Sequence, residues 1–248
     1  MFIMPPRISR LLTKLPTPEP LTSRLPHPRC YSTPSTHKED APPTDGLLYP
    51  EPPNPQHSDL DSFLAYASRT GLDTSSTVYV GTHYEYTVGL SLARYGLAAR
   101  RVGGPSDFGI DLLGTWSLPS QPQPLRVILQ CKAGTQKIGP SLIRELEGSF
   151  VGAPPGWRAP SKVLAFLVSE KPATKGVRDS LGRSSWPMGY ISCSKDGLIK
   201  QMIWNRRAEE NGLEGIGVSV RHAVDAGQPA HLVLTWDGKQ LPPRETPP

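Results

Sequence analysis

The chain has 248 residues, a mean hydropathy of -0.36 and a formal net charge of +5 at pH 7. No apolar run approaches the roughly 18 residues that a membrane-spanning helix needs, so we expect a soluble protein. Its three cysteines show neither a metal-ligand spacing nor an even number, which excludes a zinc-finger pattern and a disulfide framework. Residues 1–31 carry a net charge of +4, so the rest of the chain is nearly neutral. The basic pI of the whole chain is therefore weak evidence for nucleic-acid binding.

Residues 1–31 have the composition of a mitochondrial transit peptide, because they are basic, hold one acidic side chain and carry spaced leucines. Arg29 lies two residues before Tyr31, which predicts a matrix-processing site with cleavage after Tyr31. An ordinary basic tail is the alternative, since prolines interrupt helix formation there. Residues 32–57 are rich in Pro, Ser and Thr, which predicts a disordered linker. We therefore expect a matrix protein with one domain over residues 58–240 and a flexible tail at 241–248.

The domain begins with two predicted helices and three predicted strands. Apolar residues on one face predict a helix over 58–69. Thr82 and Glu85 fit a capping box, which predicts a second helix over 82–95. Short apolar runs then predict strands at 97–102, 109–116 and 125–133. The last of these runs is apolar throughout most of its length, which is typical of a central strand.

Helices and strands alternate in the second half of the domain. Proline at position 140 suits the first turn of a helix over 140–150. The elements predicted after it are a strand at 162–169, a helix at 174–181, a strand at 188–193, a helix at 199–211, and strands at 216–220 and 231–236. Asp237-Gly238 is a turn signal. This order indicates an α/β fold with a mixed central sheet flanked by helices.

Chemistry-bearing residues gather where the second and third predicted strands would meet. A glycine-rich stretch leads to Asp111, and the next strand ends in Gln130-Cys131-Lys132. Side chains alternate along a strand, so Gln130 and Lys132 share one face and Cys131 takes the other. If the two strands pair, an acid, an amide carbonyl and a lysine converge at one point. Such a cluster suits a divalent cation and a phosphodiester.

These motifs resemble the restriction-endonuclease-like superfamily, PD-(D/E)xK, in the Mrr-like variant where Gln replaces the second acid. The resemblance covers residues 78–169 and is carried by Asp107-Phe108-Gly109-Ile110-Asp111, by Gln130-Cys131-Lys132, by the upstream Glu85, and by Ile138-Gly139-Pro140 and Ile143-Arg144-Glu145-Leu146. With its leader, the whole chain resembles the fungal mitochondrial family called "required for respiratory growth protein 7". That family is named for a phenotype, so the resemblance implies a location and a fold more than a reaction.

The resemblance implies a role for each residue of the motif. Asp111 would be the principal ligand of Mg²⁺ or Mn²⁺, with the Gln130 side-chain carbonyl and the Cys131 backbone carbonyl as further ligands. Lys132 would orient or deprotonate the attacking water, or hold the phosphate. Glu85 would supply a second carboxylate.

Each of these residues also has an ordinary structural interpretation. Asp111 could be an acid at a strand edge, and Gln130 and Lys132 could lie on a solvated sheet face. Glu85 could only cap its helix as the partner of Thr82. Asp107 is expected to shape the glycine-rich turn through Asx hydrogen bonds rather than to bind metal.

The leading functional hypothesis is a Mg²⁺-dependent nuclease that acts on mitochondrial DNA. Candidate nucleic-acid contacts are Arg100, Arg101, Lys137, Arg144, Arg206 and Arg207, with Trp204 as a stacking residue. The alternative for these side chains is a solvated surface. A non-catalytic factor that keeps the fold and binds nucleic acid or protein is the second hypothesis. RNA processing is the third, because such a motif handles phosphates rather than bases.

Overall fold

The computed structural model describes residues 47, 49–104, 109–134, 136–158, 162–222 and 230–244. The expected transit peptide, its processing site after Tyr31 and most of the expected linker lie outside these residues, as does Asp107. No helix in the described part of the chain is long and apolar enough to cross a bilayer.

Two helices precede the sheet, and the second begins earlier than its sequence suggested. Helix α1 spans Leu60–Thr70, and the Asp59 carboxylate caps it by accepting the backbone N–H of Ser62 at 2.8 Å. Helix α2 spans Thr77–Ala93, and the Ser76 hydroxyl caps it. The predicted capping box at Thr82 and Glu85 is therefore wrong, because both residues lie inside α2 and Thr82 is buried. Glu85 consequently does not cap α2.

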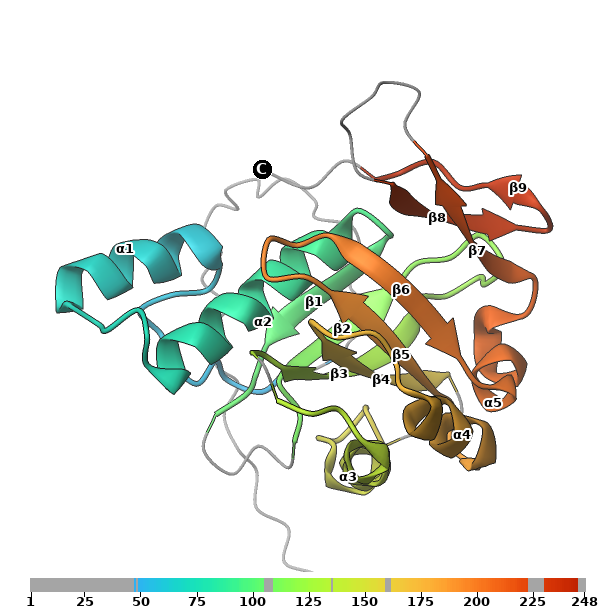
Figure 1. Ribbon diagram of the computed structural model, residues 1–248, viewed down its shortest axis with the longest axis horizontal. Coiled ribbons are helices and arrows are strands. Elements are labelled where there is room, and N and C mark those ends of the chain that lie inside the picture. The colour runs from blue at the N-terminus through green and yellow to red at the C-terminus, as the bar shows by residue number, and fades with distance from the viewer. Residues whose placement is uncertain are drawn as a thin grey trace, which may run out of the picture. The chain divides into compact units, whose positions relative to one another are not determined.

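Six strands form a mixed sheet, as expected (Figure 1). They are β1 Leu97–Arg101, β2 Leu112–Trp116, β3 Leu125–Lys132, β4 Val163–Ser169, β5 Met188–Cys193 and β6 Ile199–Trp204. The spatial order follows the chain order; β1, β2 and β3 form an antiparallel meander, and β3, β4 and β5 are parallel. The parallel connections contain helices α3 (Pro140–Gly152) and α4 (Lys175–Arg183). Strand β3 is paired on both sides, as its apolar sequence predicted.

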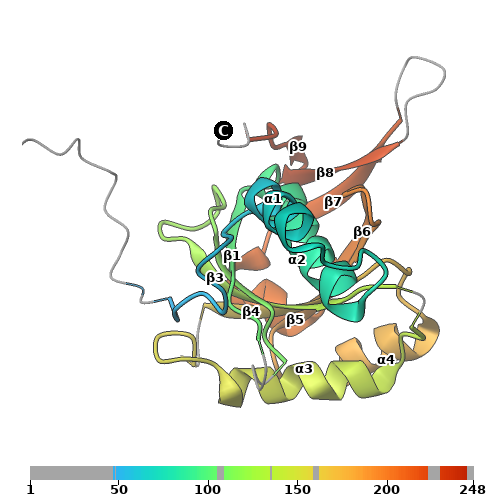
Figure 2. The same cartoon turned by 90° about the vertical axis from the view of Figure 1, so that its left-hand side faces the viewer.

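The helices cover opposite faces of this sheet. Figure 2 shows α3 and α4 below the sheet and α2 above it. Successive residues of β3 divide between the two layers: Val127 and Leu129 pack into the core beneath α2, whereas Ile128 packs beneath α3. The alternation continues to the end of the strand, which sets the faces of Gln130 and Cys131.

Residues 199–204 form strand β6, so the helix predicted over 199–211 is wrong. Strand β6 pairs antiparallel with β5, and Ile199 and Met202 are buried while Lys200 is exposed. Pairing with a neighbour and burial of one face outweigh the local helical spacing in this segment. Helical turns follow only in α5, Arg206–Ala208, and in a π-helical turn at Glu209–Leu213.

A second, three-stranded sheet closes the α2 side of the domain. It consists of β7 Ile216–Arg221, β8 His231–Trp236 and β9 Lys239–Gln240, in that order, and all its pairs are antiparallel. The expected turn at Asp237-Gly238 joins β8 to β9. Leu232 and Leu234 bury their side chains in the core that α2 covers.

Segments on both sides of the predicted domain also pack against it. Tyr49, from the predicted linker, lies edge-on to Trp157 with ring centroids 5.2 Å apart, and His57 is buried. In the predicted tail, the backbone N–H of Arg244 donates to the carbonyl of Arg94 at 3.0 Å.

Gly189 lies in β5 where the strand packs closely against its neighbours. A Cβ there would meet Phe166 Cε1 at 2.2 Å and the Ile203 carbonyl oxygen at 2.7 Å. We expect Gly189→Ala to lower the free energy of unfolding by about 3 kcal/mol, because the core would be overpacked. Urea unfolding monitored by circular dichroism measures this change.

The matched control is Gly182→Ala in α4, where a Cβ meets nothing within 4 Å. This variant should be as stable as the wild type or slightly more stable, since alanine favours helix. Equal stability of the two variants would contradict the packing described for β5.

Candidate metal and phosphodiester site

Asp111 sits where β2 and β3 stop pairing through their backbones. Its Oδ2 atom accepts the backbone N–H of Cys131 at 2.6 Å. Its own backbone N–H donates to the Leu129 carbonyl, and its carbonyl accepts the N–H groups of Val102 and Gly103. The carboxylate therefore replaces the next rung of the β2–β3 ladder, which fixes Asp111 beside the end of β3, as the motif predicted.

Gln130 and Lys132 both reach one carboxylate on α3. Gln130 is fully buried, and its Nε2 donates to Glu145 Oε1. The Lys132 ammonium donates to the same oxygen at 2.9 Å. This shared partner confirms that the two side chains lie on one face of the sheet. The prediction of a purely solvated face is wrong for Gln130, because the side chain has no exposed surface.

The site contains a residue that the motif did not assign. Glu145 lies on α3 among the core residues Leu142 and Leu146, and its own side chain is 46 % exposed. It thus lies at the border of the apolar face that α3 presents to β3. The sequence did offer one signal for Glu145, since it is an acid at the border of the apolar face of α3. Its pairing with Lys132 could not be predicted, because that contact depends on how α3 crosses the sheet.

The glycine-rich turn before Asp111 approaches Gln130 closely. Gly109 has φ +75°, and a Cβ on it would lie 2.8 Å from Gln130 Nε2. A larger residue would be strained at this φ and would displace the amide. Glycine at this position therefore lets the backbone come close to Gln130.

One buried atom of the site lacks a partner. Gln130 Oε1 accepts no hydrogen bond within the described part of the chain, although it is buried. A buried amide oxygen without a partner costs free energy, of order 1–3 kcal/mol. Native proteins usually satisfy such an atom with water, an ion or a ligand.

The donor set fits a hard divalent cation. It comprises the Asp111 carboxylate, the unpartnered Gln130 Oε1 and the backbone carbonyl of Cys131, whose N–H already faces Asp111. Oxygen ligands with few carboxylates suit Mg²⁺, which keeps several waters. Among the described residues, no group of three or more His, Cys, Asp and Glu side chains forms an alternative metal site.

Glu85 forms an ion pair with Arg101. Its Oε2 accepts from Nε of Arg101, and both side chains are 13 % exposed. The Arg101 guanidinium also lies 6.0 Å from the ring centroid of Tyr86, whose hydroxyl hydrogen-bonds His57 Nδ1 at 2.7 Å. Burial lowers the pKa of His57, and the charge of Arg101 lowers it further. Glu85 thus belongs to a cluster of interacting side chains on the α2 side of the sheet, and its role as a second carboxylate stays a prediction.

The pKa of the Cys131 thiol depends on its burial and on two nearby carboxylates. Burial raises its pKa well above the usual value, and the carboxylates of Asp111 and Glu85 raise it further. Both carboxylates therefore act on the same thiol, although Glu85 comes from α2 and Asp111 directly precedes β2.

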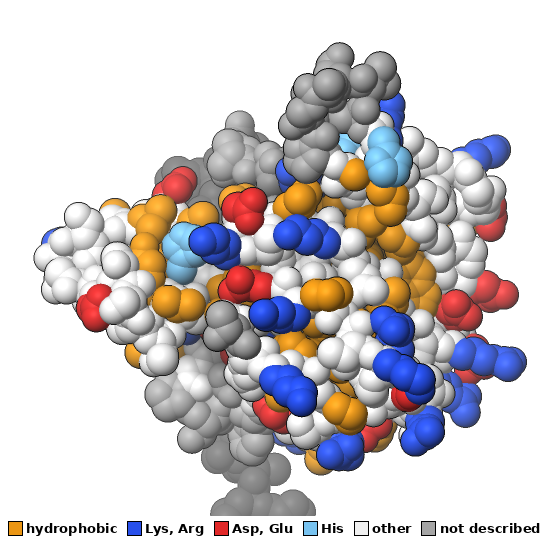
Figure 3. All heavy atoms as spheres, viewed as in Figure 1, with side chains coloured by type: hydrophobic (Ala, Val, Ile, Leu, Met, Phe, Trp, Pro, Cys, Tyr) orange, Lys and Arg blue, Asp and Glu red, His pale blue; other side chains and the backbone are white. Residues whose placement is uncertain are grey.

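The predicted nucleic-acid contacts divide into engaged and available side chains. Lys137 and Arg144 are exposed near the start of α3. Arg101 is paired with Glu85, and Arg206 and Arg207 are both paired with Glu210. Figure 3 shows basic side chains over α4 and α5 with acidic side chains between them.

Two further candidates pack against aromatic or apolar groups. The Arg100 guanidinium lies 4.8 Å from the ring centroid of Tyr49. Trp204 is part of β6 and packs against the core beneath α2. Stacking by Trp204 on a base would therefore need its partly buried ring to leave that core.

Comparison with known sequences complements this geometry. The fold and the cluster define an α/β protein with a six-stranded mixed sheet and a carboxylate, an amide and a lysine at the end of adjacent strands. The sequence profile described as "Required for respiratory growth protein 7" matches residues 76–123 and 119–221, more than half of the chain. The chain belongs to this family.

Individual relatives share part of the sequence. An uncharacterized mitochondrial protein of Schizosaccharomyces pombe is 32% identical over 156 residues, which cover 61% of each chain. The Saccharomyces cerevisiae protein named "Required for respiratory growth protein 7, mitochondrial" is 25% identical over 51% of this chain and 69% of its own length. Its Eremothecium gossypii namesake is 32% identical over 34% of this chain and 51% of its own. No solved structure matches.

The Glu85–Arg101 pair can be tested by stability measurements. We expect Glu85→Gln to lower the free energy of unfolding by about 3 kcal/mol, because it leaves the largely buried Arg101 without its partner. The double variant Glu85→Gln with Arg101→Gln should recover part of this loss, since it leaves no unpaired charge. Denaturant unfolding of the three proteins gives the values.

Lys175→Gln is the control, because it breaks the exposed pair between Lys175 and Asp179. It should cause no measurable loss. A Glu85→Gln variant that is as stable as Lys175→Gln would show that the buried pair contributes nothing to the fold.

Proposed function

We propose that this chain is a mitochondrial matrix protein with a restriction-endonuclease-like fold that hydrolyses phosphodiesters of mitochondrial DNA, with Mg²⁺ or Mn²⁺ as cofactor. The order of α2, the β1–β3 meander, α3 and β4 supports the fold assignment. The names of the relatives support the location, and respiratory growth is a phenotype expected of mitochondrial genome upkeep.

The observation that carries the proposal is the buried Gln130 Oε1 without a partner. It belongs to the residue next to Cys131, whose N–H binds the Asp111 carboxylate. A cation between Asp111 and Gln130 would be coordinated by this oxygen, so the metal that the motif implies would give the buried oxygen a partner.

The remaining residues supply the chemistry around the reacting phosphate. A bound cation would polarise the phosphodiester and lower the pKa of a water. Lys132 would orient that water or neutralise a phosphate oxygen, exchanging its exposed contact with Glu145 for one with the substrate. Lys137 and Arg144 are exposed on the α3 side and would contact the nucleic-acid backbone.

The first test is calorimetric titration of Mg²⁺ and Mn²⁺ into the full chain. We expect binding to the wild type and a loss of about 100-fold or more in affinity for Asp111→Asn, which keeps the shape but removes the charge. The control Asp179→Asn removes a carboxylate on the exposed face of α4 and should bind as the wild type does.

Cleavage assays follow on DNA and RNA of one sequence, single- and double-stranded. DNA should be cut, and Lys132→Ala should lower the rate by about 10²-fold or more. A folded wild type that binds neither cation, with or without DNA, would contradict the proposed reaction. Cleavage of RNA alone would favour RNA processing instead.

Glu145 favours a second candidate function, a non-catalytic factor that binds nucleic acid or protein. Its carboxylate occupies both Gln130 and Lys132, which an active site would need for substrate and metal. The missing second acid of the motif points the same way, because one carboxylate holds a cation weakly.

The two functions predict different growth phenotypes. If the chain is a binding factor, Asp111→Asn and Lys132→Ala should each support respiratory growth when they replace the wild-type chain. Immunoblots must show equal protein levels. Loss of growth in both variants, with folded and abundant protein, would rule out the non-catalytic function.

A further inference from the structure

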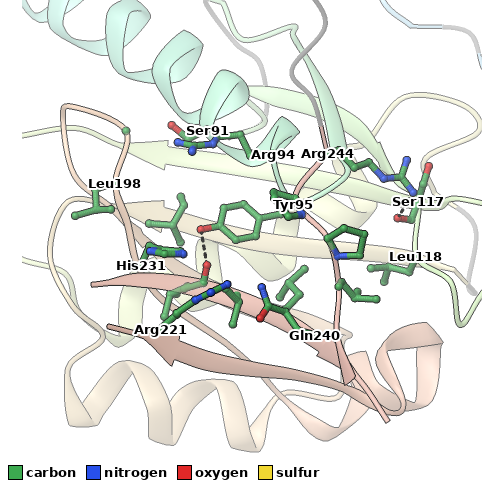
Figure 4. Close-up of a pocket in the computed structure, with 18 of the residues that line it drawn as sticks. Ser91, Arg94, Tyr95, Ser117, Leu118, Leu198, Arg221, His231, Gln240 and Arg244 are labelled. Atoms are coloured by element: carbon green, nitrogen blue, oxygen red, sulfur yellow. Dashed lines mark hydrogen bonds between the residues drawn. The ribbon is translucent and has the colours of Figure 1, made fainter. Parts of the chain in front are cut away.

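A cavity of about 810 Å³ lies between the end of α2, the turn before β6 and strand β8 (Figure 4). Small-molecule sites typically enclose roughly 300–1,000 Å³. None of Asp111, Gln130, Lys132 and Glu145 lines this cavity. It is therefore separate from the cluster on which the proposed function rests.

Part of the cavity wall is apolar, and hydrogen bonds hold it in place. Tyr95, Leu118, Leu232 and Leu234 are among its lining residues. The Tyr95 hydroxyl donates to the Leu232 carbonyl at 3.2 Å, and the Tyr95 carbonyl accepts from the Trp116 indole at 2.9 Å. In Figure 4 the Tyr95 ring stands in the middle of the cavity residues. The cavity thus offers a fixed aromatic ring and leucine side chains to an apolar or flat group.

Three arginines from separate elements line the same cavity. Arg94 follows α2, Arg221 ends β7 and Arg244 follows β9. Figure 4 shows Arg94 and Arg244 on one side of Tyr95 and Arg221 on the other. Within the described part of the chain, none of the three forms an ion pair with a carboxylate, and the lining contains one acidic residue, Asp196.

Arg244 is positioned by its own contacts. Its backbone N–H donates to the Arg94 carbonyl at 3.0 Å, and its Nη2 donates to the Ser117 carbonyl at 3.2 Å. Gly96 has φ +81°, and a Cβ there would lie 3.1 Å from Arg244 Nε, so the glycine leaves room for this guanidinium. These contacts order the Arg244 side chain before a ligand binds, which reduces the conformational entropy lost on binding.

We propose that this cavity binds a phosphate monoester with an apolar or aromatic body. Three guanidiniums against one carboxylate match a phosphate monoester, which carries about −1.5 to −2 charge at neutral pH. One guanidinium donates two parallel hydrogen bonds to phosphate oxygens, so the phosphate lies at Arg244 and the body lies on Tyr95 and the leucines, while Arg94 and Arg221 add positive charge around it. A nucleoside monophosphate and a single-chain acyl glycerol phosphate share this chemistry.

Calorimetry on the full chain separates the two sources of the ligand. The probes are adenosine monophosphate, a short-chain lysophosphatidate below its micelle concentration, and inorganic phosphate. One organic probe should bind at least about tenfold more tightly than inorganic phosphate, because only it has a body to bury. Whichever probe binds identifies the source.

Arg244→Gln should weaken binding of that probe by about tenfold or more, and Arg221→Gln should weaken it by a smaller factor, because it removes positive charge without removing the phosphate contact. Arg206→Gln is the control, since Arg206 is exposed on α5 and does not line the cavity. Thermal unfolding without ligand checks that the variants fold, and Arg221 at the exposed end of β7 provides a test that leaves the Arg244 contacts intact. Absence of binding by both organic probes, or equal affinity in the cavity variants and the control, would overturn the proposal.

Discussion

The hydrogen bond from the Cys131 N–H to the Asp111 carboxylate is the contact on which the candidate site depends. Backbone pairing between β2 and β3 ends with Leu112 and Leu129, and the aspartate side chain continues the ladder for one more rung. The two strands separate beyond this point, so side chains from both can face a common space. The same contact orders the end of β3 from which Gln130 and Lys132 project to α3. The sheet therefore sets the positions of Gln130 and Cys131, and the hydrogen bond to Cys131 holds Asp111, which directly precedes β2, beside them.

Glu145 makes this arrangement different from a bare catalytic motif. It joins the amide and the ammonium through one oxygen, and thereby connects α3 to the end of β3. The contact with Lys132 is partly exposed and so contributes little to stability by itself. Its importance lies in occupying groups that a phosphate or a cation would otherwise engage. The balance between Glu145 and a ligand for those groups decides whether the cluster acts as a site or as a structural junction.

Local pattern predicted the parts of this protein that depend on neighbours in sequence. The alternation along β3 placed Gln130 and Lys132 together, and the apolar runs identified the sheet. The errors have tertiary causes. Ser76 rather than Thr82 caps α2, and pairing with β5 makes residues 199–204 a strand. The partner of Arg101 lies 16 residues away on a helix, and Glu145 reaches β3 only because α3 crosses that strand. Local hydrophobic periodicity does not reveal such contacts, because they depend on how the helices pack on the sheet.

The alternation along β3 has a consequence for the chemistry of the organelle that the family names indicate. It turns the one cysteine of the motif toward the α2-side core, where burial and two carboxylates raise the pKa of the thiol. Peroxides and electrophiles react with thiolates, and a raised pKa lowers the thiolate fraction of Cys131, although its own backbone lies beside Asp111. The alternation thus places the one thiol of the motif where it is less reactive than an exposed cysteine of low pKa.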